Sequence, residues 1–239
     1  MKTITSPSHP LVKHFVRLRT ERKERESTRS VLLLGKKMLL PKVQTLIVTD
    51  EQSLPEGVSY EALIVVSAAV MKKIWGIASP EGAAAIAELP AFQSLEGKRR
   101  ILVMDGVSDP GNMGTLIRTA LAFGWDGVFL LEGACDPFND KALRAAKGAT
   151  FTLPLAWGNW EDLNSLISKN GAKALVADLK GGSPPKALNQ PIVLVVGNES
   201  LGVSETARRC CQAITLSMSS EMESLNVAVA GGILLYELR

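Results

Sequence analysis

The sequence predicts an α/β protein with two domains, and two features of its pattern support this. Short apolar runs alternate with segments of helical spacing along the 239-residue chain, which is typical of parallel sheets that helices cover on both faces. Residues 90–100 combine proline, glycine and three consecutive basic residues, as linkers often do. We therefore expect a first domain at residues 1–93 and a second at residues 97–239.

The first domain is expected to be a compact α/β module, within the usual range of domain sizes. Apolar residues at helical spacing after Ser8-His9-Pro10 predict a capped amphipathic helix, and runs of apolar or β-branched residues predict strands. The expected elements are a helix within 6–19, a strand at 31–34, a short helix at 36–42, strands at 45–49 and 63–66, a helix at 67–75 and a strand at 83–89.

The second domain alternates more regularly, and its near-continuously apolar strands predict a buried parallel sheet. The expected elements are a strand at 101–105, a helix at 113–121, a strand at 128–131, a helix at 139–147, a strand at 151–154, a helix at 160–169, strands at 173–177 and 192–196, and a last helix ending near Leu238. That last helix is apolar on nearly every side, so we expect it to be buried or to form an interface.

The charge of the chain is unevenly distributed. The net charge is only +3, but residues 1–43 contain 11 Lys or Arg against three Glu, so the remaining 196 residues carry −5. A basic first segment on a nearly neutral body is typical of proteins that bind a polyanion. The interleaved charges between Arg17 and Arg29 fit a solvated helix equally well, so charge alone leaves nucleic-acid binding open.

Composition excludes several classes of protein. The three cysteines, Cys135, Cys210 and Cys211, have no metal-ligand spacing and favour a reduced interior, so we expect no metal site. No apolar run reaches the ~18 residues of a membrane span, and the first residues lack the apolar core of a secretory signal. A cytoplasmic protein that is not embedded in a membrane is expected.

Three segments that break the local pattern each follow an apolar strand, where α/β sheets gather ligands. In the first, Asp105 to Gly114 is a glycine-rich turn that enters a helix and suits anions. Arg118 lies about 140° around that helix from Met113 and can face outward. The segment matches neither a Walker phosphate loop nor a dinucleotide fingerprint. An ordinary turn followed by a surface arginine is the simpler alternative.

The other two segments have equally simple alternatives. In Val195 to Ser204, Gly197 would let a ligand approach the backbone closely, and Ser204 could cap the next helix. In the third, Ile214 to Met218 is followed by Ser224-Leu225-Asn226 and the last helix. Ser224 and Asn226 could simply cap that helix.

Together, the three segments resemble a known family. DPGNMGTLIRTA, VVGNESLGVS and ITLSM followed by SLNVAVAGG are similar, in that order, to the signature motifs of the SpoU (TrmH-like) RNA 2′-O-ribose methyltransferases of the SPOUT superfamily. The resemblance covers residues 100–239. Residues 1–93 look like the ribosomal-protein-like, RNA substrate-binding domain of the same family. Two positions depart from the pattern: Leu34 stands where relatives usually have an acidic residue, and Ser200 where glycine is common.

The resemblance implies a parallel sheet with a trefoil knot near the carboxyl end, a homodimer, and S-adenosylmethionine as cofactor. The RNA substrate is ribosomal RNA rather than transfer RNA in this interpretation, because many transfer-RNA members carry only short extensions. The implied cofactor-binding residues are Gly197, Asn198, Leu216, Met218 and Leu225. The implied catalytic residues are Asn112, Arg118, Glu199, Ser224 and Asn226.

Arg118 would engage a phosphate beside the target ribose and stabilise the developing alkoxide. In the family the matching arginine has been proposed as the general base, but a guanidinium is effectively always protonated in proteins and is a poor base at pH 7. Glu199 and Asn112 would orient Arg118, while Ser224 and Asn226 would shape the loop between cofactor and ribose. The alternatives are a transfer-RNA enzyme, an RNA-binding protein that has lost methyl transfer, and a nucleotide-dependent metabolic enzyme.

Overall fold

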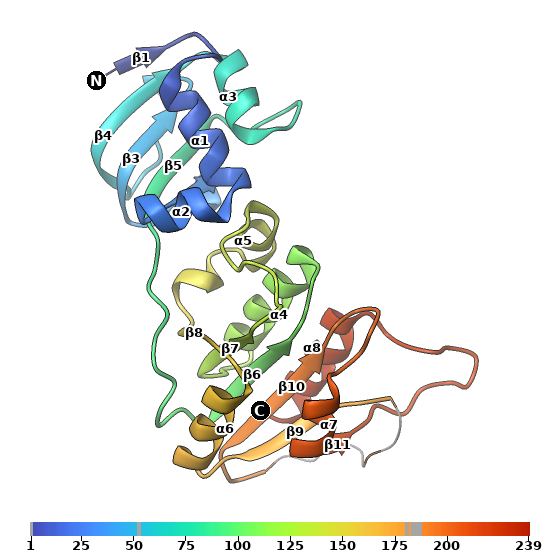
Figure 1. The fold of residues 1–239 in the computed structure, drawn as a ribbon. Coiled ribbons are helices and arrows are strands. Elements are labelled where there is room, and N and C mark those ends of the chain that lie inside the picture. The colour runs from blue at the N-terminus through green and yellow to red at the C-terminus, as the bar shows by residue number, and fades with distance from the viewer. Residues whose placement is uncertain (1, 52–53, 180–181, 183–187) are drawn as a thin grey trace. The chain divides into compact units, whose positions relative to one another are not determined.

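The computed structural model describes residues 2–51, 54–179, 182 and 188–239. These residues form two compact units (Figure 1): unit 1 contains Met1–Pro90 and Phe138–Lys147, and unit 2 contains Ala91–Pro137 and Gly148–Arg239. Both units are mixed α/β, as the sequence predicts. No helix in the described part of the chain is long and apolar enough to cross a membrane.

Unit 1 is built on a mixed five-stranded sheet with the order β1-β4-β3-β5-β2. Strand β5 pairs antiparallel with β2 and β3, and the other pairs are parallel. Its elements are β1 (Lys2–Ile4), α1 (Pro10–Thr20), α2 (Arg22–Thr28), β2 (Ser30–Leu34), η1 (Lys36–Met38), β3 (Lys42–Val48), β4 (Ser59–Val66), α3 (Ala68–Trp75), β5 (Ala83–Glu88) and α5 (Asp140–Ala146).

Helix α1 forms where the sequence predicts an amphipathic helix. The His9 side chain caps it by accepting a hydrogen bond from Leu11 N, and its buried face contributes Val12, Phe15 and Leu18 to the core of the unit. The helix expected at 36–42 is only the short 3-10 helix η1, because strand β3 already begins at Lys42.

Two helices of unit 1 differ from the sequence-based expectation. Helix α2 lies in the charged stretch that showed no apolar periodicity, and its buried residue is Arg25. The Arg25 guanidinium donates to Leu18 O at 2.6 Å and Arg19 O at 3.2 Å, near the end of α1. Helix α5 comes from the second half of the sequence but packs against β2, with Leu143 among its buried residues. Residues 138–147 therefore group with unit 1.

Unit 2 is built on a six-stranded, entirely parallel sheet with the order β11-β9-β10-β6-β7-β8. Its elements are β6 (Arg100–Asp105), α4 (Pro110–Ala122), β7 (Gly127–Leu131), η3 (Ala149–Phe151), β8 (Leu155–Gly158), α6 (Trp160–Lys169), β9 (Lys173–Ala177), β10 (Ile192–Gly197), α7 (Glu205–Cys210), β11 (Gln212–Ile214) and α8 (Val227–Glu237). The predicted parallel sheet is confirmed. The prediction of a strand at 151–154 is wrong, because η3 ends at Phe151 and strand β8 begins only at Leu155.

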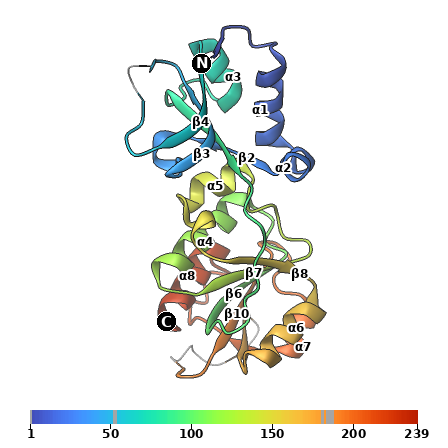
Figure 2. The ribbon, with the colours of Figure 1, turned by 90° about the vertical axis from the view of Figure 1, so that its left-hand side faces the viewer.

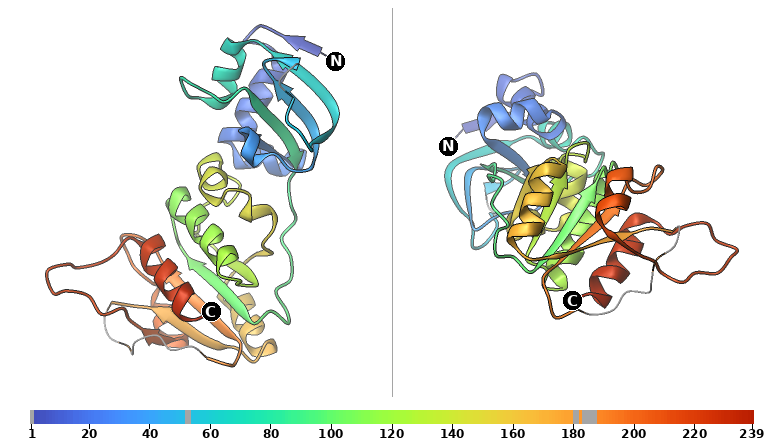
Figure 3. Two further views of the ribbon diagram at one scale, coloured as in Figure 1. Left: turned by 180° about the vertical axis from the view of Figure 1, so that it is seen from behind. Right: turned by 60° about the horizontal axis from the view of Figure 1, so that its bottom comes forward.

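Helices cover both faces of this sheet. Helices α6 and α7 lie on one face and α4 and α8 on the other (Figure 2). Helices α4 and α8 approach closely, since a Cβ built on Gly231 would lie 2.5 Å from a Leu116 methyl carbon. Trp125 Nε1 donates to Leu235 O at 3.0 Å and fastens the end of α8. Between β11 and α8, residues 215–226 form a long projecting loop (Figure 3).

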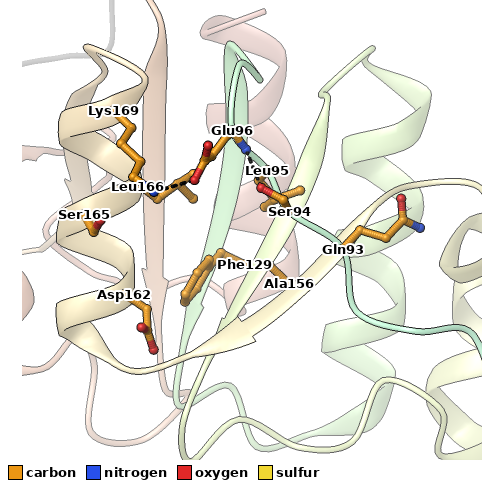
Figure 4. Close-up of a pocket in the computed structure, with 10 residues that line it drawn as sticks. All are labelled: Gln93, Ser94, Leu95, Glu96, Phe129, Ala156, Asp162, Ser165, Leu166 and Lys169. Carbon is orange, nitrogen blue, oxygen red and sulfur yellow. Dashed lines mark hydrogen bonds and ion pairs between the residues drawn. The ribbon is translucent and has the colours of Figure 1, made fainter.

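Residues 93–97, which belong to the expected linker, make contacts with other parts of unit 2. Gln93 N donates to Leu155 O at 2.7 Å, Glu96 pairs with Lys169, and Leu95 is buried. A small cavity of about 210 Å³ lies between this segment and α6, with Phe129 in its wall (Figure 4). The segment thus forms part of the second compact unit.

Candidate active site

Strands β6 and β10 are neighbours, so the segments that follow them leave the sheet side by side. Gly197 at the end of β10 pairs with Asp105 at the end of β6. Asp105 Oδ2 accepts a hydrogen bond from Ser204 N at 2.8 Å, and Asn198 Nδ2 donates to Gly106 O at 2.9 Å. The first two motif segments therefore form one structure at the carboxyl edge of the sheet, where α/β proteins bind ligands.

The turn after β10 is internally bonded. Asn198 and Gly202 exchange two backbone hydrogen bonds of 2.9 and 3.0 Å, and Asn198 Oδ1 accepts from Ser200 N and Leu201 N. A Cβ built on Gly197 would lie 2.5 Å from the Gly202 backbone. The turn itself therefore requires glycine at this position, which differs from the ligand approach that the sequence indicated.

The side chain of Glu199 ties the first segment to the second. One carboxylate oxygen accepts from Ser108 N at 3.0 Å and Ser108 Oγ at 2.8 Å, and the other accepts from Asp109 N and Asn112 Nδ2 at 3.0 Å each. Partial desolvation of the carboxyl group would raise the pKa of Glu199, but these hydrogen bonds outweigh it and lower the pKa to about 2. An ionised carboxylate with four donors is suited to holding the loop rather than accepting a proton.

Two asparagines connect the first segment to the third. Asn112 Oδ1 accepts a hydrogen bond from Asn226 Nδ2 at 3.1 Å, so Asn112 bridges Glu199 and Asn226. Asn226 also caps α8 through Ala228 N at 2.8 Å, which the sequence suggested. The cap and the inter-segment bond use different atoms of one amide, so the start of α8 and the start of α4 are held in a fixed relation.

The second and third segments line a pocket of about 640 Å³, and the first segment, none of whose described residues lines it, is hydrogen-bonded to them through Glu199, Asn112 and Asn226. The five residues predicted to bind a cofactor all line it, together with three of the five predicted catalytic residues. The lining members of the predicted set are Gly197, Asn198, Leu216, Met218, Leu225, Glu199, Ser224 and Asn226. Asn112 lies one hydrogen bond behind Asn226.

Arg118 lies apart from these residues. It is exposed on α4, as its helical position predicts, and it is not among the described residues that line the pocket. Glu199 and Asn112 bind each other and do not orient the Arg118 guanidinium, for which the described part of the chain offers no hydrogen bond or ion pair. The proposed orientation of Arg118 by these two residues is therefore not seen in the single chain.

The sequence analysis did not identify three charged residues that line the pocket, namely Asp178, Arg208 and Glu223. Asp178 directly follows β9, and its Oδ2 accepts a hydrogen bond from Arg208 Nε of α7 at 2.8 Å. Ligands of α/β sheets gather where parallel strands end, so the position of Asp178 directly after an apolar strand could have indicated it from the sequence. Nothing in the pattern of the short helix α7 marked Arg208.

Solved structures share this architecture, one over nearly the whole chain and one over part of it. An AdoMet-bound rRNA methyltransferase from Sinorhizobium meliloti is 30% identical, with a TM-score of 0.85 and coverage of 98% of this chain and 96% of that chain. A TrmH/SpoU tRNA modifying enzyme from A. aeolicus is 27% identical, with a TM-score of 0.51 and coverage of 59% of this chain and 75% of that one. The fold and the pocket place the protein in the class of RNA methyltransferases with a parallel α/β sheet.

Sequence comparison identifies the family. The SpoU rRNA Methylase family matches residues 99–236. The 23S rRNA (guanosine(2553)-2'-O)-methyltransferase RlmP of Bacillus subtilis (strain 168) is 33% identical, and the match covers the full length of both proteins. The chain belongs to the SpoU rRNA methylase family.

Proposed function

We propose that the chain transfers the methyl group of S-adenosylmethionine to a ribose 2′-hydroxyl in RNA. The observation that carries this proposal is that three segments far apart in the sequence are hydrogen-bonded together at the carboxyl edge of a parallel sheet, where two of them line one pocket. Family membership supports it, as does the likeness to an AdoMet-bound rRNA methyltransferase. The alternative of an RNA-binding protein without catalysis would predict loss of these polar residues, and they are retained.

The residues of the pocket fit S-adenosylmethionine. A volume of about 640 Å³ is within the roughly 300–1,000 Å³ of small-molecule sites. Leu216 and Leu225 supply an apolar wall for adenine, and the bonded turns supply backbone donors and acceptors. The carboxylates of Asp178, Glu199 and Glu223 also line the pocket and favour a ligand that carries a sulfonium charge.

The cofactor supplies an activated methyl group, so the protein must align the reacting atoms. In this proposal Glu199 fixes the segment Ser108–Asn112 against the turn after β10. Ser224 and Asn226, which line the pocket, position the ribose. Arg118 neutralises a phosphate and the developing alkoxide rather than removing the proton.

We also propose that a second copy of the chain brings Arg118 to the pocket. Val229, Ile233 and Tyr236 form an apolar stripe on the exposed side of α8, with exposed fractions of 50%, 40% and 46%. Such a stripe is typical of a surface that a partner covers, and α8 packs against α4, which carries Arg118. A symmetric dimer would cover the stripe and present each Arg118 to the partner.

A complementation experiment tests this arrangement. Arg118→Ala and Asn226→Ala chains are each expected to be inactive, but mixed dimers contain one intact site if Arg118 acts on the partner's pocket. When equal amounts of the two variants assemble at random, half of the dimers are mixed and each of these has one intact site out of two. About a quarter of wild-type activity should then be restored. Activity that stays at the level of the separate variants would contradict action between chains.

Ribosomal RNA is the proposed substrate. A relative that matches over the full length of both chains is named as a 23S rRNA methyltransferase, whereas the tRNA modifying enzyme matches only 59% of the chain. Residues 1–93 are proposed to bind RNA, supported by the basic excess of residues 1–43. A cytoplasmic location and the trefoil knot implied by the resemblance belong to the same proposal.

Mapping of ribose methylation in cells with and without the gene tests the choice of substrate. A 2′-O-methyl group blocks alkaline cleavage at its nucleotide, so one ribosomal position should become cleavable when the gene is deleted. Loss of protection in transfer RNA instead would assign the enzyme to the other substrate class.

A further inference from the structure

The pocket contains a single cation among the described residues that line it. Asp178, Glu199 and Glu223 contribute negative charge to the lining, and Arg208 contributes the one positive charge. A positively charged cofactor is attracted to this lining. One group of S-adenosylmethionine is disfavoured there, namely the carboxylate of its amino acid part, because like charges repel in a partly desolvated site.

The Arg208 guanidinium is held in place by two carboxylates. Its Nε donates to Asp178 Oδ2 at 2.8 Å, and its Nη1 donates to Glu205 Oε1 at 2.9 Å. The side chain of Asp178 is only 9% exposed and that of Arg208 31% exposed, so this ion pair lies in the wall rather than in open solvent. Both acidic partners raise the pKa of Arg208, first through the hydrogen bond to Asp178.

The remaining nitrogen of Arg208 faces the turn after β10. A Cβ built on Gly202 would lie 3.7 Å from Arg208 Nη2, and both residues line the pocket. No described residue accepts a hydrogen bond from Nη2. A guanidinium has five N–H donors in a rigid fork, so the two anchoring bonds leave donors for a ligand.

We propose that Arg208 binds the carboxylate of the amino acid part of S-adenosylmethionine and is thereby a cofactor-specificity residue. The inference rests on the proposed function. Asp178 and Glu205 orient the fork before the ligand arrives, which lowers the cost of binding. Arginine is suited to this role because its fork can donate two parallel hydrogen bonds to a carboxylate.

A thermodynamic cycle between protein and ligand tests the proposal. Calorimetry measures the affinity of wild-type protein and of Arg208→Gln for S-adenosylmethionine and for decarboxylated S-adenosylmethionine, which lacks only the carboxylate. Wild-type protein should bind the decarboxylated compound about 10-fold more weakly. General attraction to the acidic pocket predicts the opposite order, because the decarboxylated compound carries more positive charge.

Arg208→Gln should weaken S-adenosylmethionine binding by the same factor and leave binding of the decarboxylated compound within about twofold, so that the two changes are not additive. Arg209→Gln is the matched control, since Arg209 is the exposed neighbour outside the described pocket lining. Its affinities for both compounds should equal those of the wild type.

If Arg208→Gln lost affinity equally for both compounds, Arg208 would only hold α7 against β9, and the proposal would be overturned. Equal affinity of wild-type protein for the two compounds would overturn it without any variant, so a poorly folded variant leaves the test intact. Failure of wild-type protein to bind either compound would contradict the proposed function itself.

Discussion

Replacing Glu199 by glutamine tests whether this carboxylate orders the active site. The carboxylate accepts four hydrogen bonds of 2.8–3.0 Å, two from Ser108 and one each from Asp109 and Asn112. Glutamine keeps the shape but has one oxygen, so two of these donors would face an NH₂ group. Asn112 cannot turn its amide to compensate without losing its bond from Asn226.

The expected cost follows from these lost bonds. A hydrogen bond to a charged group contributes about 1.5–3 kcal/mol, but Glu199 is exposed and water replaces part of the loss. We therefore expect Glu199→Gln to destabilise the hydrogen-bonded arrangement of residues 106–112 by about 1–3 kcal/mol. If methyl transfer needs this arrangement, kcat/KM falls about 5- to 150-fold.

Hydrogen exchange and steady-state kinetics together measure this effect. The amides of residues 106–112 should exchange faster in Glu199→Gln in step with the loss of kcat/KM. Glu221→Gln is the control, because Glu221 is an exposed carboxylate outside the described pocket lining and no described residue hydrogen-bonds to its side chain. Loss of turnover with unchanged exchange would refute the positioning role, and so would unchanged values of both.

Three further predictions concern Gly197, the apolar stripe of α8 and the ionisation of Glu199. Gly197→Ala should weaken S-adenosylmethionine binding at least about tenfold in calorimetry, because the added Cβ would meet the Gly202 backbone. Gly232→Ala is the control and should bind the cofactor normally, because its Cβ makes only ordinary van der Waals contact. Equal cofactor affinities of the two variants would contradict the packing argument. Ile233→Glu should convert the proposed dimer to a monomer in light scattering, and an unchanged mass would exclude the α8 stripe as the interface. The pKa of Glu199 is lowered from 4.5 to about 2, so its ionised form stabilises the fold fully above about pH 4.5 and progressively less as the pH falls toward 2. The difference in unfolding free energy between wild type and Glu199→Gln should shrink over that interval, and a constant difference would contradict the assignment.

Much of the second unit could be predicted from local pattern. Helix α6 and strand β9 have the expected bounds, because their apolar spacing and capping residues are unambiguous. Helix α2 was missed because its buried side chain is an arginine that bonds to carbonyl groups of α1, which no hydrophobic pattern marks. The assignment of α5 to unit 1 depends on long-range packing against β2, and local sequence contains no signal for it.

The site was predictable in part for the same reason. Parallel strands bring their carboxyl ends to one edge of the sheet. The second and third segments each follow an apolar strand, and this position predicted that they would lie where a ligand binds. Pair contacts across the fold were not predictable. The bonds of Glu199 to Ser108 and Asn112 and the position of Arg118 outside the pocket depend on side-chain direction, which spacing alone does not give.

The central claim is that the pocket lined by the second and third motif segments directs a methyl group to a ribose oxygen of ribosomal RNA. Purified protein can be incubated with ribosomal RNA from cells lacking the gene and with methyl-labelled S-adenosylmethionine, and the RNA then digested to nucleosides for mass spectrometry. We predict that the label appears in one 2′-O-methylnucleoside and is reduced with Gly197→Ala protein at a cofactor concentration near the wild-type Kd. Label on a base, or no transfer to RNA, would contradict the account.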